Sequence, residues 1–212
     1  MVNPHQVTRD FEQALCTYTG SPFAVATTSC TMALLLALEW HNSEPRWESL
    51  REYPESVVKI PKHTYVSVPM SITHAGFYVE FEDRDWEGAY QLYPLPVYDY
   101  ARWFTSGMFG MGDREAFLCV SFHWSKTLAI GQGGAILHNN VEADKWFRRM
   151  RFDGRTEGVA PKDEKDLLLG YHAYMSPRDA ADGLSRLAVL PEHNNPLPND
   201  DYPDLSKMEI FK

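Results

Sequence analysis

Six short apolar runs, separated by polar or helical stretches, restrict the fold of this chain more than any other feature of its sequence. They are residues 23–27, 56–61, 77–82, 95–98, 117–122 and 135–138. Runs of this length, rich in β-branched and aromatic residues, are typical of strands. Strands that alternate with helices indicate βαβ units. We therefore expect an α/β fold with a mostly parallel sheet flanked by helices.

The segments between these runs show apolar residues at helical spacing. The predicted helices are residues 7–18, 32–40, 65–75, 141–152 and 177–190. Gly20 and Gly76 stand where two of them should stop, and Pro177 suits a first helical turn. Residues 41–55 are predicted to form a polar connection. From residue 191 onward proline, asparagine and aspartate dominate, so we expect one domain over residues 1–190 and an extended tail over 191–212.

Composition excludes several classes of function. The 212 residues contain 20 Lys and Arg against 29 Asp and Glu, a formal net charge of −9, which argues against a protein that binds nucleic acid. Cys16, Cys30 and Cys119 lie far apart, as expected for reduced thiols and not for a disulfide framework or a zinc site. The first residues lack a leader pattern, and no apolar run approaches the roughly twenty residues of a membrane span. We expect a cytoplasmic protein that contacts no membrane.

The strand predicted at residues 117–122 ends beside a lysine. Ser121 lies at its end, and Lys126 follows just before the glycine-rich loop at residues 131–134. In open α/β sheets ligands bind outside the carboxyl ends of the strands. Partial desolvation there favours the neutral amine, which can attack a carbonyl and form a Schiff base. Taken alone, a lysine in this position is more often an ordinary surface lysine after a strand.

Two further strand ends carry matching groups. Ser29 and Thr31 lie at the start of the predicted helix 32–40, where free N–H groups favour a phosphate. Asp99 directly follows the strand at residues 95–98. A phosphate site, an amine and a carboxylate for a ring nitrogen are what pyridoxal 5'-phosphate requires of a protein. The sequence lacks GxxxxGK[ST], a GxGxxG that opens a helix, GxSxG and any metal-ligand spacing, so we predict no metal.

These features recur in the order found in a known family. The chain resembles the DegT-type nucleotide-sugar aminotransferases, which are pyridoxal-phosphate-dependent transferases of fold type I. The matching segments, spread over about residues 7–190, are 11–20, 24–34, 61–66 through 75–76, 97–101, 120–126 with 131–134, 170–176 and 180–184. The resemblance is most specific at Val120-Ser-Phe-His-Trp-Ser-Lys126 with its Gly-Gln-Gly-Gly loop.

The resemblance implies a role for each matching residue. Lys126 would carry the cofactor and Asp99 would pair with its ring nitrogen, and these two are the predicted catalytic residues. Tyr65 would stack on the cofactor ring. The phosphate would be bound by residues of two strand ends, namely Ser29, Cys30, Thr31 and Ser121.

Four positions depart from the family pattern. Cys30 stands where the family has glycine, which would leave the backbone less free to approach a phosphate. Arg102 stands where the family usually has glutamine, beside the cofactor's phenolic oxygen. His172 and Tyr174 replace an asparagine and an arginine in a segment that in the family reaches the neighbouring subunit's site, so His172 is a candidate phosphate donor there.

The implied activity is transfer of an amino group from an amino acid, with glutamate the expected donor, to a keto-sugar, preferably nucleotide-linked. The implied assembly is a homodimer. Lys126 disfavours the related sugar dehydratases, in which histidine takes that place. The expected chain is a shortened form without the family's C-terminal small domain. Two alternatives stay open: a non-catalytic or partly degenerate relative that acts as a cofactor-binding or interaction module, and a different reaction on the same cofactor.

Overall fold

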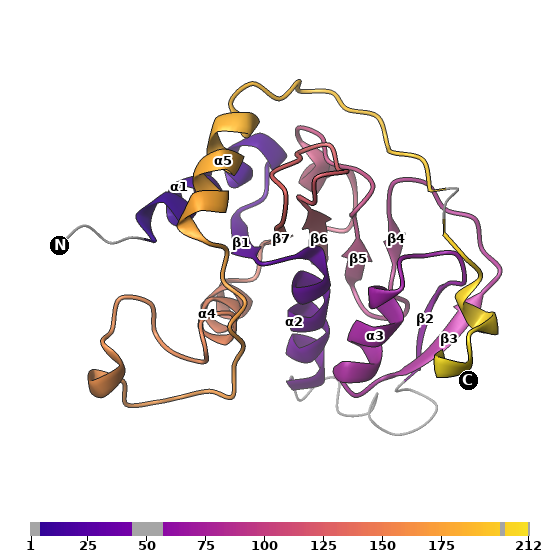
Figure 1. Ribbon diagram of the computed structural model, residues 1–212, viewed down its shortest axis with the longest axis horizontal. Helices are drawn as coiled ribbons and strands as arrows, with labels where there is room; N and C mark the ends of the chain where they lie inside the picture. Colours follow the sequence, from indigo (N-terminus) through magenta and orange to yellow (C-terminus); the bar gives the residue numbers. More distant parts are fainter. Residues whose placement is uncertain (1–4, 44–56, 200–201, 212) are drawn as a thin grey trace.

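The computed structural model describes residues 5–43, 57–199 and 202–211 (Figure 1). The helices are α1 (Gln6–Thr19), α2 (Cys30–Ser43), α3 (Ser67–His74), α4 (Val141–Met150) and α5 (Pro177–Leu187). The strands are β1 (Phe23–Thr27), β2 (Val57–Pro61), β3 (Tyr78–Glu82), β4 (Tyr90–Gln91), β5 (Val97–Asp99), β6 (Phe117–Ser121) and β7 (Gly134–His138). Short 3-10 turns lie at Met108–Met111, Pro161–Asp163, Leu205–Lys207 and Glu209–Phe211.

Five strands form the central sheet, in the order β1-β7-β6-β5-β4. β5 and β6 are parallel, whereas β1 with β7, β7 with β6, and β4 with β5 are antiparallel. β2 and β3 form a separate parallel pair, and an antiparallel bridge from Lys59 to Tyr93 joins that pair to the chain just after β4. The α/β class is confirmed, but the expected mostly parallel sheet is wrong: the central sheet is mixed.

The physical reason is the position of β7. It follows β6 after the glycine-rich loop, returns antiparallel along it, and lies between β6 and β1. β1, β5 and β6 still run in one direction, because β1 and β6 are each antiparallel to the same strand. β2 also runs this way, since its bridge to the β4 end of the chain is antiparallel.

The helices cover the two sides of the sheet. α2 and α3 pack together against it in Figure 1, and α1 packs against α5. The α2 helix is almost wholly buried, whereas α4 and α5 each bury one face, as amphipathic helices do. Two layers of core result, one under α2 and α3 and one under α1 and α5.

Local sequence signals place several helix ends. Gly20 adopts the left-handed φ of 78° that ends α1, and its N–H donates to the carbonyl of Cys16. The Asn140 side chain accepts from two N–H groups at the start of α4, and Ser176 accepts from Asp179 at the start of α5. The element predictions therefore hold within a few residues, although α3 begins two residues later than expected and the short β4 was not predicted. Most of the predicted 41–55 connection lies outside the described residues.

The C-terminal tail, described over residues 191–199 and 202–211, is hydrogen-bonded to the rest of the protein. In Figure 1 it runs from α5 across the top of the sheet to the side of β3. Its backbone is extended over residues 191–199, without helix or strand, and Leu205 near its end is fully buried. Backbone bonds from Ser106 to Glu192, from Leu197 to Arg102 and from Leu205 to Lys62 fix its course.

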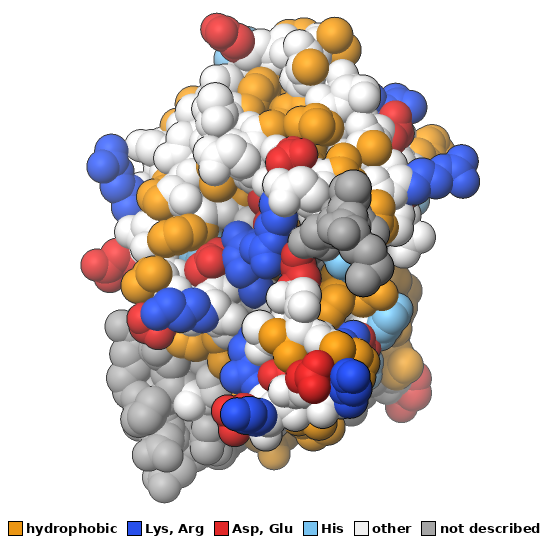
Figure 2. Space-filling view, turned by 90° about the vertical axis from the view of Figure 1, so that its left-hand side faces the viewer, with side chains coloured by type: hydrophobic (Ala, Val, Ile, Leu, Met, Phe, Trp, Pro, Cys, Tyr) orange, Lys and Arg blue, Asp and Glu red, His pale blue; other side chains and the backbone are white. Residues whose placement is uncertain are grey.

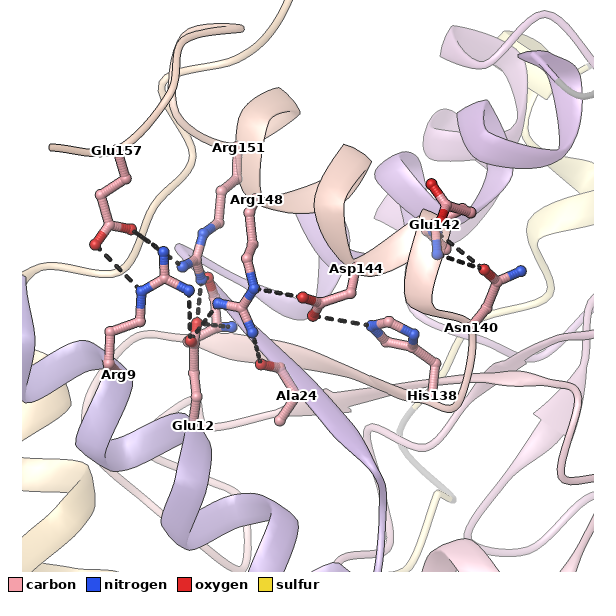
Figure 3. Close-up of polar contacts among 12 residues, drawn as sticks. Arg9, Glu12, Ala24, His138, Asn140, Glu142, Asp144, Arg148, Arg151 and Glu157 are labelled. Atoms are coloured by element: carbon pink, nitrogen blue, oxygen red, sulfur yellow. Dashed lines mark hydrogen bonds and ion pairs between the residues drawn. The ribbon is translucent and has the colours of Figure 1, made fainter. Parts of the chain in front are cut away.

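A buried ionic cluster joins α1 to α4 (Figure 3). The Glu12 carboxylate contacts the guanidinium of Arg148 at 2.6 Å and that of fully buried Arg151. Arg148 also holds Asp144 at 2.7 Å. Figure 2 shows basic and acidic side chains intermixed near the centre of the face on the α1 side of the molecule.

Two guanidinium groups determine the ionisation of Glu12. Burial alone raises the pKa of Glu12, but the charges and hydrogen bonds of Arg151 and Arg148 outweigh it, so the pKa lies below its usual value. The carboxylate therefore stays charged and compensates Arg151, which has no access to water.

We expect Glu12→Gln to lower the free energy of unfolding by about 3–5 kcal/mol, because removal of one partner leaves a buried charge uncompensated. Urea denaturation at pH 7 measures this. The control is Asp182→Asn, which breaks the exposed pair with Arg186 on α5 and should cost less than about 1 kcal/mol.

The same carboxylate should give the wild type an acid-sensitive stability. Because its pKa is lowered on folding, the unfolded chain binds the proton first, and stability falls as the pH drops below the usual value of 4.5. Glu12→Gln should lose less over that range. Equal slopes for the two proteins would contradict the assignment.

Candidate functional site

A cavity of about 300 Å³ lies at the carboxyl ends of β1, β5 and β6. Eight of the nine residues predicted to bind the cofactor line it: Ser29, Cys30, Thr31, Tyr65, Asp99, Arg102, Ser121 and Lys126. They come from four separate stretches of chain, residues 29–31, 65, 99–102 and 121–126. The cavity is at the lower end of the size range of small-molecule sites, which suits a compact ligand.

The register of the sheet creates this convergence. Thr27 in β1 pairs with Gly134 in β7, and Gly134 pairs with Ser121 in β6. The turn at residues 28–31 therefore lies level with the end of β6. Asp99 at the end of β5 pairs with Cys119, which lies two residues before Ser121 in β6. The end of β5 therefore lies within two residues of the level of Ser121.

The turn after β1 presents a helix N-terminus. The Ser29 hydroxyl accepts from the Met32 N–H at 3.2 Å, and its carbonyl accepts from Ala33. The Thr31 hydroxyl lies 2.7 Å from that of Ser67 at the start of α3. Free N–H groups and hydroxyls at the start of α2 make this turn suitable for an anion.

Cys30 fits the turn without strain. Its backbone is the first residue of α2 and has no positive φ, so a glycine is not needed for conformation. Its thiol points into the protein, 3.5 Å from the carbonyl of Cys119, and burial holds the pKa of Cys30 well above its usual value. Cysteine in place of glycine therefore does not force the backbone of this turn into a strained conformation.

The close approach falls on a different glycine. A Cβ atom on Gly134 would lie 2.4 Å from the Cys30 nitrogen and 2.5 Å from the Ser29 carbonyl carbon. No side chain fits between β7 and the turn. Gly134 therefore sets how closely the sheet packs against the start of α2.

Asp99 is a buried carboxylate with fixed orientation. One oxygen accepts from the Ala101 N–H at 2.8 Å and the other from the Tyr90 hydroxyl at 3.0 Å. Burial raises the pKa of Asp99, against the lowering effects of these bonds and of Lys126 and Arg102. A cationic ring nitrogen placed against it would favour the charged carboxylate.

Lys126 is half-buried on the loop that leaves β6. The backbone N–H of Lys126 donates to the His123 carbonyl and closes a turn. Across the loop, the backbone N–H of Trp124 donates to the Gly131 carbonyl. The His123 ring nitrogen lies 2.9 Å from the Ser125 hydroxyl, and both residues line the cavity with Lys126.

His172 lies elsewhere. Its ring is exposed and contacts the Asp153 carboxylate at 3.0 Å, and it does not line the cavity of its own chain. That position is compatible with the predicted contact to a neighbouring subunit, which stays a prediction.

Several lining residues were not predicted. Ser67, His123, Ser125 and Gln132 follow predicted site residues closely, so proximity in sequence could have indicated them. Tyr90 holds Asp99, and Tyr202 comes from the tail. Both reach the site through tertiary packing, for which the sequence offers no local signal.

Solved structures show which fold this chain shares. AtS13 from Actinomadura melliaura is 20% identical with a TM-score of 0.68, covering 88% of this chain and 60% of its own. A GDP-4-keto-6-deoxymannose-3-dehydratase with bound GDP-perosamine is 17% identical with a TM-score of 0.68, and the match covers 88% of this chain and 61% of that one. NtdA from Bacillus subtilis with bound PMP is 18% identical with a TM-score of 0.63, and the match covers 87% of this chain and 48% of that one. No curated protein matches.

The family follows from the sequence itself. The model of the DegT/DnrJ/EryC1/StrS aminotransferase family matches residues 3–94 and 98–196, and the chain belongs to that family. The predicted resemblance and fold class are confirmed. This chain spans about 60% of the length of the first solved relatives.

The residues present fit the family's cofactor. Pyridoxal 5'-phosphate is the cofactor of this family, and the cofactor prediction is confirmed at that level. The cavity offers a buried carboxylate, an amine and a helix N-terminus on one surface, the donor set that this group requires. Within the described ranges no group of His, Cys, Asp and Glu is arranged to hold a metal ion.

No helix among the described residues is long and apolar enough to cross a membrane.

We expect Gly134→Ala to disturb the turn at the start of α2, because its methyl group would overlap backbone atoms that cannot move independently. The free energy of unfolding should fall by about 1–3 kcal/mol, and the dissociation constant for pyridoxal phosphate should rise. Thermal unfolding and absorbance titration measure the two effects. Gly110→Ala, where nothing lies within 4 Å of the added methyl, is the control. Equal behaviour of both variants would contradict the close approach.

Proposed function

We propose that this protein is a pyridoxal-phosphate-dependent aminotransferase that moves an amino group from an amino acid, glutamate first among the candidates, to a keto-sugar carried on a nucleotide. One observation supports it most: Asp99 and Lys126, distant in sequence, line the same cavity as the turn at the start of α2. Family membership supports the aminotransferase class. The sugar-nucleotide ligand of a solved neighbour supports the acceptor class.

Each residue has a role that its position suits. The turn with Ser29 and Thr31, together with Ser121, would bind the phosphate through N–H groups and hydroxyls. Asp99, held by Tyr90 and the Ala101 N–H, would keep the ring nitrogen protonated. The cofactor, when bound, supplies an electron-accepting ring and a carbonyl for amines.

Lys126 has two tasks. Its Nζ would attach the cofactor covalently, and an incoming amino donor would release it. The released amine would be placed to take the proton from the donor's Cα as a general base and to deliver a proton to the cofactor carbon as a general acid. Partial burial at the cavity wall keeps the amine close to its target.

The alternative is a cofactor-binding or interaction protein of the same family that does not transfer amino groups. Such a protein would have the same cavity and the same attachment of the cofactor at Lys126, but it would not convert glutamate into 2-oxoglutarate. A racemase or eliminating enzyme would share both residues and yield no 2-oxoglutarate.

We expect borohydride reduction of the cofactor-loaded protein to fix a pyridoxyl group on Lys126, identified by peptide mass mapping. Lys126→Arg keeps the charge and should give no reduced adduct. Addition of glutamate before reduction should protect Lys126 and release one equivalent of 2-oxoglutarate per site.

Three outcomes separate the readings. An adduct with 2-oxoglutarate release supports the aminotransferase. An adduct without release favours the non-catalytic relative or another reaction. Absence of an adduct on Lys126 in the wild type would overturn the proposal.

We also propose a homodimer, in which His172 and its segment reach the partner's site. The exposed position of the His172 ring supports such a contact. Sedimentation equilibrium should give about twice the chain mass of 24.3 kDa, and His172→Ala should weaken phosphate binding in the dimer. A monomer across the micromolar range would contradict this assembly.

A further inference from the structure

One residue of the cofactor cavity comes from the tail. Tyr202 lines the cavity with Tyr65 and Arg102, although it lies fifteen residues beyond the end of α5. Family membership does not account for it, because the matched region ends at residue 196.

The tail is held along its course by bonds to the body of the protein. Trp103 donates its ring N–H to the Asn194 carbonyl at 2.9 Å, and Asn199 donates its side-chain amide to the Trp86 carbonyl at 2.8 Å. Beyond Tyr202, the chain forms a bridge between His63 and Asp204, and Leu205 is fully buried. Contacts on both sides of Tyr202 therefore fix its position.

Tyr202 is packed among site residues. Its ring lies under the Arg102 guanidinium, with the central carbon 4.8 Å from the ring centre. It stacks on Trp86 with ring centres 6.1 Å apart and meets Tyr65 edge to face at 6.4 Å. At this distance the ring face attracts the guanidinium electrostatically.

We infer that Tyr202 is a positioning residue of the cofactor site, which holds the Arg102 guanidinium in place at the cavity wall. The inference rests on the proposed function and on the expectation, from the family resemblance, that Arg102 of the cavity wall lies beside the cofactor's phenolic oxygen. A fixed cation there stabilises the phenolate and disfavours a second positive charge on the nitrogen that joins Lys126 to the cofactor. The tail thus contributes to the electrostatics of the site as well as to its shape.

The test compares Tyr202→Phe with Tyr202→Leu. Phenylalanine keeps the π face and should behave as the wild type. Leucine removes it, and the dissociation constant for pyridoxal phosphate should rise about 3- to 10-fold, as expected for the loss of one partly shielded cation–π contact. The pKa of the Lys126 linkage, read from the visible absorption during a pH titration, should rise in the leucine variant.

A double variant separates positioning from general packing. If Tyr202 acts through Arg102, Tyr202→Leu should change neither quantity further in an Arg102→Gln background. The matched control is Ile210→Ala in the same tail, at a side chain that is 72% exposed. Should the leucine variant not fold, Tyr202→Gln removes the same ring without adding apolar surface and is read in the same way.

The outcomes distinguish the two proposals. A wild type without an adduct on Lys126 overturns the proposed function and this inference with it. A wild-type adduct, with leucine and glutamine variants that match the wild type in both cofactor affinity and linkage pKa, overturns this inference alone. Additive effects of Tyr202→Leu and Arg102→Gln also overturn it.

Discussion

The common direction of four strands is the constraint on which the site depends. β1, β2, β5 and β6 all run the same way, so the residues that follow them meet at one edge. No single strand end would hold a cofactor. The end of β1 offers N–H groups and hydroxyls, β5 a carboxylate, and β6 leads to an amine. Hydrogen-bonded register, fixed at Thr27, Gly134 and Ser121, brings these groups level.

This explains why residues that line one cavity could be picked out from the sequence, although the strand directions of the sheet could not. Locating Asp99, Ser121 and Lys126 required only that each follow a buried strand and that these strands share a direction. Neither condition requires the strands to be adjacent in the sheet. The parallel prediction failed because β7 enters between β6 and β1, and an apolar run such as Ala135-Ile-Leu-His138 carries no mark of its direction.

The remaining differences come from contacts between distant segments. The sequence identified Cys30 as the departure at the turn, whereas the structure places the steric demand on Gly134 across the strand pairing. Tyr90 fixes Asp99 from a two-residue strand too short to give a periodic pattern. Tyr202 lies in a segment whose composition predicted only a tail. Local pattern reports what a residue's neighbours in sequence are, and these three roles depend on neighbours in space.

The buried ionic cluster connects the stability of the molecule to this site. β1 lies at one edge of the central sheet. Apart from the bridge between Thr27 and Tyr174, its outer N–H and C=O groups have no strand beside them among the described residues. Glu12 accepts from the Ala26 N–H at 2.9 Å, and Arg148 donates to the Ala24 carbonyl at 3.2 Å. The charged side chains that hold α1 to α4 thus also complete the edge of β1. Because β1 leads directly into the turn at the start of α2, the cluster fixes the backbone on which that side of the cavity depends.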